Sequence, residues 1–227
     1  GQPVSLATEG AAVVDLMNVM GYDAMTIGRL DLSKGLAALQ QRANEAHFPL
    51  LSANLVKKGT QERLFPADTV ITRNGVRYGI LGVTEAESAL APGASDAIDV
   101  LDPVETVRAV LPDLQARSDV VVVLSHLGIE EDQALAAAVP GIDIIIGGRS
   151  RNLLQEPKIV GSTVITQMGF DGEYLGRLDV TVNEDGSVGD AVVQIVTLTP
   201  EIADDPEVAD MVLRYKSEYP EPTPVTS

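Results

Sequence analysis

GYDAMTIGRLDLSKG, residues Gly21 to Gly35, joins a short apolar segment to a polar loop. Its first half, Ala24 to Ile27, has the pattern of a buried strand and ends at Gly28. Open α/β sheets place their functional groups where a strand ends in glycine and a polar loop leads into a helix. The residues after Gly28 are Arg29, Leu30, Asp31, Leu32 and Ser33. This mixture contains neither a nucleophile paired with a base nor a cluster of metal ligands.

Helices and strands are predicted to alternate around this stretch. Apolar periodicity predicts helices over Ala11–Met20 and Lys34–His47, with Gly21 in the C-cap position of the first helix. Strands are predicted over Asp23–Ile27 and Pro49–Asn54. Such alternation is typical of a parallel sheet covered by helices.

The rest of the chain predicts a mixed sheet rather than a purely parallel one. Asn74-Gly75 joins two alternating segments, Leu64–Arg73 and Val76–Val83, which is a strong hairpin signal. Continuous β-branched runs over Asp119–Leu124 and Ile142–Ile146 predict buried parallel strands. The remaining helices are predicted over Val104–Ala116, which Asp102 caps and Pro103 begins, and over Glu130–Ala138 and Asp205–Tyr215. Antiparallel strands are predicted over Ser162–Gln167, Tyr174–Asn183 and Ser187–Leu198, the last two joined at Asp185-Gly186.

The chain is long enough for one domain. Residues 1–218 are predicted to form it, and residues 219–227, YPEPTPVTS, are expected to be a proline-rich tail or linker. The formal net charge is −17, which would repel nucleic acid and anionic membranes. No apolar run approaches the roughly 20 residues needed to span a bilayer, so we expect neither a nucleic-acid partner nor membrane insertion. The absence of cysteine excludes disulfides, thiolate metal sites and a cysteine nucleophile.

Polar loops follow three predicted strands: Arg29–Ser33 after Ile27, Ser125–Gly128 after Leu124, and Gly147–Arg151 after Ile146. The carboxyl ends of parallel strands lie at one edge of a sheet. We therefore expect these three loops to converge.

Five blocks of the chain resemble, in order, the N-terminal catalytic domain of bacterial 5'-nucleotidases, within the calcineurin-like metallophosphoesterases. The blocks are PVSLATEGAAVVDLMNVMGYDAMTIG, FPLLSANL, VVVLSHLG, PGIDIIIGGRS and TPEIADDPEV. The resemblance implies a four-layer α/β/β/α sandwich with mixed sheets, whose first strands would lie before Gly1. It also implies metal-dependent hydrolysis of phosphate or nucleotide esters, and export to the periplasm or cell surface.

The family's catalytic loops hold two divalent metal ions, and this chain departs from them at most positions. Arg29 stands where the resemblance implies a metal-binding Asn, and Leu30 where it implies the catalytic His. Asp31 replaces a Glu of the same motif, and Ser33 replaces an Asp.

The other two loops differ in whether they keep the family's metal ligands. His126 matches a family metal ligand, whereas Arg149 and Arg151 stand where the last loop would have its two histidines. The family's Asp-x-His and Gly-Asp motifs would lie before Gly1. Of the family's ligand positions, His126 is therefore the one that this sequence matches.

Charge argues against a metal at these loops. A two-metal hydrolytic site needs several carboxylate, imidazole or amide ligands, and one imidazole holds a dication weakly. Two unit charges about 4 Å apart interact by about 4 kcal/mol at an effective dielectric of about 20, so a protonated arginine repels a dication by roughly twice that. We therefore expect no catalytic residue and no metal cofactor.

Two interpretations of the polar loops remain open. The arginines could form an anion pocket, since guanidinium groups match phosphate, sulfate and carboxylate groups bidentately. Alternatively they could fill a former metal site by pairing with Asp31, Glu130 or Glu131. His126 could equally be a strand-end histidine hydrogen-bonded to backbone, and Asn54 an ordinary turn residue. The anion-binding candidates are Arg29, Arg149, Arg151, His126 and Asn54.

Two functional hypotheses follow. In the first, the chain is a non-catalytic descendant of a metallophosphoesterase that serves as a scaffold or interaction module. Its partners would be a protein in a larger assembly, or a small anion or nucleotide. In the second, it is a metal-dependent hydrolase of phosphate or nucleotide esters with a rebuilt or incomplete site.

Overall fold

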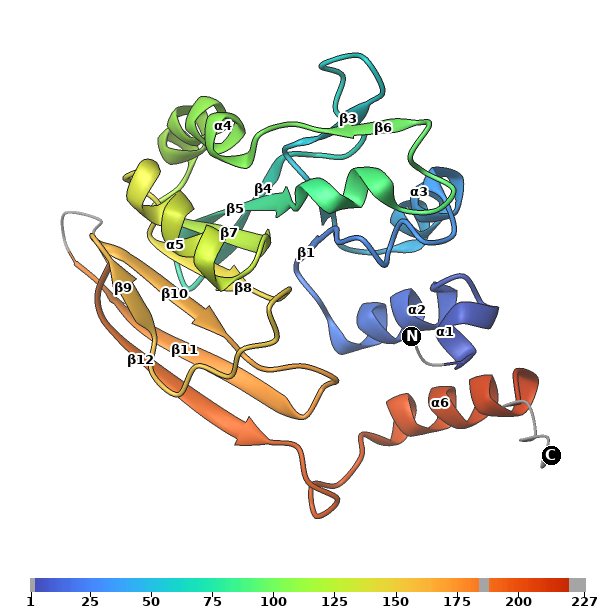
Figure 1. Ribbon diagram of the computed structural model, residues 1–227. Coiled ribbons are helices and arrows are strands. Elements are labelled where there is room, and N and C mark those ends of the chain that lie inside the picture. The colour runs from blue at the N-terminus through green and yellow to red at the C-terminus, as the bar shows by residue number, and fades with distance from the viewer. Residues whose placement is uncertain (1–2, 184–187, 221–227) are drawn as a thin grey trace.

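A six-stranded mixed sheet forms the centre of the computed structural model, which describes residues 3–183 and 188–220 (Figure 1). Four neighbouring strands, β5, β7, β8 and β10, run parallel, and the edge strands β4 and β9 are antiparallel to their neighbours. Across the sheet the strands are β4 (Asp68–Arg73), β5 (Val76–Thr84), β7 (Val120–His126), β8 (Ile144–Gly147), β10 (Thr163–Gln167) and β9 (Lys158–Val160).

Two helices, α4 (Pro103–Arg117) and α5 (Ile129–Ala138), cover one face of this sheet. Leu114, Leu135 and Ile145 are fully buried between the helices and the strands. The Asp102 carboxylate accepts a hydrogen bond from Glu105 N at 2.8 Å, which caps α4 as the sequence predicted.

Two small sheets pack against the opposite face. One pairs β1 (Met25–Thr26) with β2 (Leu50–Leu51) in parallel, and the other pairs β11 (Tyr174–Val182) with β12 (Val188–Thr197) in antiparallel fashion. Side chains from both pack on the central sheet in one apolar cluster.

Outside β1 and β2 lie α2 (Ala11–Met20) and α3 (Leu36–Glu45). Leu39 and Leu50 are buried between these layers. The layers thus follow the order helix, sheet, sheet, helix, which confirms the mixed α/β sandwich expected from the sequence.

Shorter elements complete the described chain. They are α1 (Pro3–Ala7), β3 (Leu55–Lys57) paired with β6 (Ile98–Val100), the 3-10 helix η1 (Ala86–Leu90) and α6 (Pro206–Glu218). α6 lies beside α2, where the Tyr215 hydroxyl donates a hydrogen bond to Asp15. No helix within the described residues is long and apolar enough to cross a membrane.

The Asn74-Gly75 hairpin is confirmed, with both residues at positive φ, 53° and 84°. The antiparallel assignment of Ser162–Gln167 is wrong in part, because β10 pairs in parallel with β8 and is antiparallel only to β9, a strand that was not predicted. Apolar patterning reports which residues are buried, not which way a strand runs. The predicted Asp185-Gly186 turn lies outside the described residues, as does the tail from residue 221 onward.

Candidate functional site

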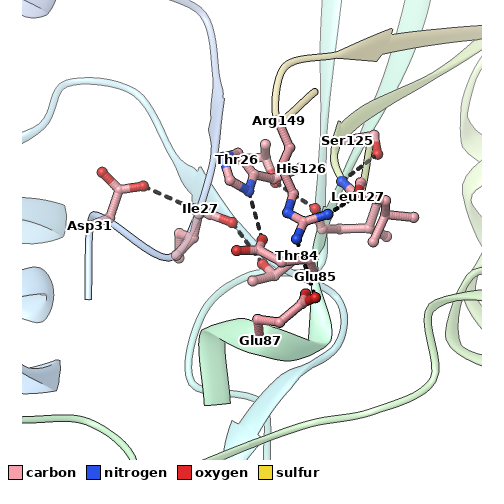
Figure 2. Close-up of polar contacts among 12 residues, drawn as sticks. Thr26, Ile27, Asp31, Thr84, Glu85, Glu87, Ser125, His126, Leu127 and Arg149 are labelled. Carbon is pink, nitrogen blue, oxygen red and sulfur yellow. Dashed lines mark hydrogen bonds and ion pairs between the residues drawn. The ribbon is translucent and has the colours of Figure 1, made fainter. Parts of the chain in front are cut away.

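The carboxyl ends of β1, β5 and β7 meet at one edge of the molecule, together with the loop after β8 (Figure 2). Thr84, the last residue of β5, pairs in register with His126, the last residue of β7. The Thr84 hydroxyl donates a hydrogen bond to the Ile27 carbonyl at 2.8 Å, which fixes the end of β1 to the end of β5. The expected convergence of the strand-end loops is confirmed.

His126 and Glu85 form an ion pair at the centre of this edge, with 2.6 Å between Nδ1 and Oε2. Glu85 is 3% exposed. Burial alone would lower the pKa of His126, but the hydrogen bond and charge of Glu85, with the charge of Asp31, outweigh it and raise that pKa. Burial would raise the pKa of Glu85, yet the hydrogen bond and charge of His126 lower it overall. Both shifts favour the doubly charged pair.

Gly28 lies over one face of the imidazole ring of His126. A Cβ atom at Gly28 would stand 2.6 Å from His126 Nε2, which no real side chain tolerates. The Gly28 amide donates to Asp31 Oδ2 at 2.8 Å. Burial raises the pKa of Asp31, and the Gly28 hydrogen bond and the His126 charge only partly oppose it.

Arg149 ties the loop after β8 to this edge. Its Nη1 donates to the Leu127 carbonyl at 3.0 Å, and its Nη2 lies 3.2 Å from Glu87 Oε1 (Figure 2). One of the two interpretations drawn from the sequence paired the arginines with Asp31, Glu130, Glu131 or solvent, and Arg149 pairs with Glu87 instead. Glu87 comes from η1, which follows β5 directly.

The remaining anion-binding candidates are Arg151, Asn54 and Arg29, and each has different surroundings. The Arg151 guanidinium stacks over the Phe170 ring, 5.5 Å from its centroid. Asn54 is fully buried, and its amide group bonds Thr84 N and O and the Leu101 carbonyl. Arg29 is exposed and has no hydrogen bond or ion pair within the described residues. The structure therefore brings His126 and Arg149 together, whereas Arg151 and Asn54 have other contacts.

Sequence reasoning missed both acidic residues of the site, Glu85 and Glu87. The signal was present in the segment Thr84-Glu85-Ala86-Glu87, where two carboxylates follow the end of a predicted strand. Their importance depends on the pairing of β5 with β7, which the local pattern does not specify.

A buried acid, Asp132, lies beneath the same loops. The Ser125 hydroxyl donates to Asp132 Oδ1, while Oδ2 is buried and has no hydrogen-bond partner among the described residues. Burial raises the pKa of Asp132 to about 6, and the Ser125 hydrogen bond opposes the shift. Beside it, Gln167 Oε1 accepts from Ser150 Oγ and Asn152 N, both at 2.9 Å. This polar group anchors the loop that carries Arg149.

The residues of this edge do not fit the two-metal site that the resemblance implies. Glu85 holds Nδ1 of His126 and Gly28 lies over the ring, which leaves Nε2 as a single imidazole nitrogen for a metal. Over residues 3–183 and 188–220, no three side chains of His, Cys, Asp or Glu are grouped so that they could hold a metal ion. The cationic Arg149 beside His126 further disfavours a dication.

Known proteins resemble both the sequence and this fold. No protein-family model matches the chain. The uncharacterized metallophosphoesterase YunD of Bacillus subtilis (strain 168) is 31% identical over 188 residues, covering 80% of this chain and 40% of YunD. Related 5'-nucleotidases, such as that of Vibrio vulnificus (strain CMCP6), are 29% identical over 72% of this chain and 35% of their own length. The chain thus spans well under half the length of these curated relatives.

A solved structure of a 5'-nucleotidase is also similar to this chain. The 5'-nucleotidase precursor from Thermus thermophilus superposes with a TM-score of 0.87 at 26% identity, covering 95% of this chain and 46% of that protein. The chain is therefore a homologue of metallophosphoesterases and 5'-nucleotidases, and it has the calcineurin-like phosphoesterase fold that the sequence resemblance predicted.

Proposed function

We propose that this chain is a non-catalytic phosphoesterase-like domain that acts as a scaffold or interaction module. One observation carries the proposal: over residues 3–183 and 188–220, His126 is not joined by two further His, Cys, Asp or Glu side chains in a group that could hold a metal ion. A two-metal hydrolytic site needs several such ligands, and the cationic Arg149 beside His126 disfavours a dication.

The neighbouring positions support the same conclusion. Leu30, which stands where the family resemblance implies the catalytic histidine, has no group that exchanges a proton. Arg149, at a position of a family histidine, is held by Leu127 and Glu87. The edge is thus stabilised by its own ion pairs. The resemblance also supports export to the periplasm or cell surface, which fractionation of cells that produce the natural protein would check.

The test combines metal analysis with hydrolysis on the 227-residue chain. The protein is incubated with Mn²⁺, Zn²⁺ or Ca²⁺, its metal content is measured, and turnover of an aryl phosphate and of AMP is followed. We expect metal well below one equivalent and no turnover above buffer. The Thermus thermophilus 5'-nucleotidase serves as the positive control, and His126→Asn as the variant that would lose any site-bound metal.

The second candidate, a hydrolase with a rebuilt site, is favoured by the relatives, which include 5'-nucleotidases. Stoichiometric metal with turnover, both abolished in His126→Asn, would establish the hydrolase and overturn the non-catalytic proposal. Turnover that survives in His126→Asn points to a contaminating phosphatase and leaves the proposal standing.

A small anion remains a candidate ligand of this edge because Arg29 is exposed and without a partner in the described chain. An anion there would also have to draw Arg149 away from Glu87. Thermal shift with phosphate, AMP and ATP tests this: a ligand at about 100 times its Kd adds about 2.7 kcal/mol of stability. The shift should vanish in Arg29→Gln and persist in Arg214→Gln, a matched exposed arginine on α6.

A further inference from the structure

A cavity of about 280 Å³ lies apart from the Glu85–His126 pair, between α1, α2 and the segment that leads from Gly28 into α3. Its floor is formed by Met25 of β1 and Leu50 of β2, and its walls by apolar residues of the helices. An engineered apolar cavity of about 150 Å³ holds benzene. This one therefore has room for a molecule of roughly ten non-hydrogen atoms, and it is too small for a segment of a partner protein.

The mouth of the cavity is unusually apolar for a surface. Leu6, Val13 and Leu30 all line it, and they are 48%, 43% and 73% exposed. Large apolar side chains that gather in this way around a hollow mark a binding surface rather than ordinary scatter. Met17 and Met25 add flexible walls that adapt to the shape of a ligand.

Polar residues line the cavity on two sides: Ser5 and Glu9 come from α1 and the turn after it, and Asp31, Ser33 and Lys34 come from the segment that leads into α3. The Ser33 hydroxyl and the Lys34 ammonium line the cavity, and neither has a partner in the part of the chain that the structure describes. Asp31 also lines it, with one carboxylate oxygen already accepting from Gly28 N. A mostly apolar cavity with a few convergent polar groups is the usual form of a small-molecule site.

The charges of the lining residues decide the class of ligand. Both signs of charge line the cavity, Glu9 and Asp31 against Lys34 and Arg42. Arg42 is not available to a ligand, because its guanidinium donates to the Thr8 carbonyl at 3.0 Å and to Glu45 at 2.8 Å. An anionic head group would therefore meet two carboxylates beside Lys34, and a cationic one would meet the ammonium of Lys34, whereas a hydroxyl or amide can accept from Lys34 or Ser33 and donate to Asp31.

From this combination we infer that the cavity binds a small, largely apolar, uncharged molecule with one hydroxyl or amide head group. The apolar body lies among Leu6, Val13, Met17 and Leu30, and the head group faces Ser33 and Lys34. The cavity is distinct from the Glu85–His126 pair, which does not line it, although Leu30 and Asp31 of the loop after β1 do.

The experiment compares three probes that share one tail: 1-octanol, octanoate and octylamine. Binding to the 227-residue chain is followed by NMR, through the backbone amides of α2 and of residues 30–35. We expect saturable shifts with 1-octanol, and at least tenfold weaker binding of the two charged probes. No saturable binding of 1-octanol up to its solubility limit overturns the site, and equal or tighter binding of a charged probe overturns the ligand class.

A filling variant and a matched control locate the binding. Val13→Phe places a ring at the mouth from a partly exposed position, so the fold should tolerate it, and it should weaken 1-octanol binding at least tenfold. Leu213→Phe on α6 is a similarly exposed change away from the cavity and should leave binding unchanged. Equal binding by the two variants would show that the probe binds elsewhere and overturn the inference.

Discussion

Glu85 and His126 are held as a charged pair because each shifts the pKa of the other in the direction that preserves its charge. The pair is largely buried, so water screens it less than it screens the surface ion pairs of this acidic chain. Through this pair, His126 joins the end of β7 to the residue that follows β5.

Glu85→Gln and His126→Gln should show pH-dependent coupling in a double-mutant cycle of unfolding free energies. The raised pKa of His126 contributes stability below its ordinary value of 6.5, and that contribution is lost as pH rises through the folded pKa. The lowered pKa of Glu85 contributes above 4.5 and is lost as pH falls through the folded pKa. We expect a coupling of about 1–3 kcal/mol that is largest between these values.

A suitable control is the exposed pair Glu105 and Arg108 on α4, for which the same cycle should give no more than about 0.5 kcal/mol. Coupling at Glu85 and His126 that is equally small, or that does not change between about pH 5 and 9, would contradict the ion pair.

Asp132 lowers the stability of the folded protein at neutral pH. Its pKa of about 6, against an ordinary 3.8, gives stability that is complete below the ordinary value and is lost as pH rises through about 6. Relative to Asp132→Asn, the wild type should lose about 3 kcal/mol between about pH 3.5 and 8, from about 1.4 kcal/mol for each pKa unit. Chemical unfolding across this range measures the difference.

The trend should reverse for Asp119→Asn, because Arg77 lowers the pKa of Asp119 and the wild type then gains stability as pH rises. Parallel curves for the wild type and Asp132→Asn would show that folding leaves the pKa of this acid near its ordinary value.

The loop after β1 depends on a close approach that one added methyl group would break. Gly28→Ala would bring a Cβ to 2.6 Å from His126 Nε2, so either the loop or the imidazole must move. We expect a loss of about 1–3 kcal/mol in unfolding free energy, with displaced His126 signals in the NMR spectrum. Gly148→Ala is the control, since its Cβ would meet nothing closer than 3.9 Å.

The molecule as a whole is a layered sandwich to which α6 is attached loosely. α6 has no buried residue within its described length, and one hydrogen bond, from Tyr215 to Asp15, joins it to α2. Segments with so few buried contacts open without global unfolding.

Tyr215→Phe should therefore release α6 while changing global stability by no more than about 1 kcal/mol. Limited proteolysis between β12 and α6 should become faster in this variant. Tyr219→Phe, which lies just after the helix, should leave the cleavage rate unchanged. An equal cleavage rate in Tyr215→Phe and the wild type would show that this hydrogen bond does not hold the helix.

Local pattern was enough for most of the fold. The buried β-branched runs, the Asn74-Gly75 turn and the Asp102 cap each depend on residues that are neighbours in the chain, and the structure confirms all three. The ligand replacements that the family resemblance implies at Arg29, Leu30 and Arg149 likewise need no coordinates, because they concern only which side chains are present.

Long-range pairing was decided by the folded chain alone. Glu85 and His126 are 41 residues apart, and they meet because β5 and β7 pair with Thr84 opposite His126. The choice of Glu87 as the partner of Arg149, and the parallel direction of β10, depend in the same way on how distant segments pack. Hydrophobic periodicity records which side of an element is buried, but it carries no information on which distant segment will cover that side.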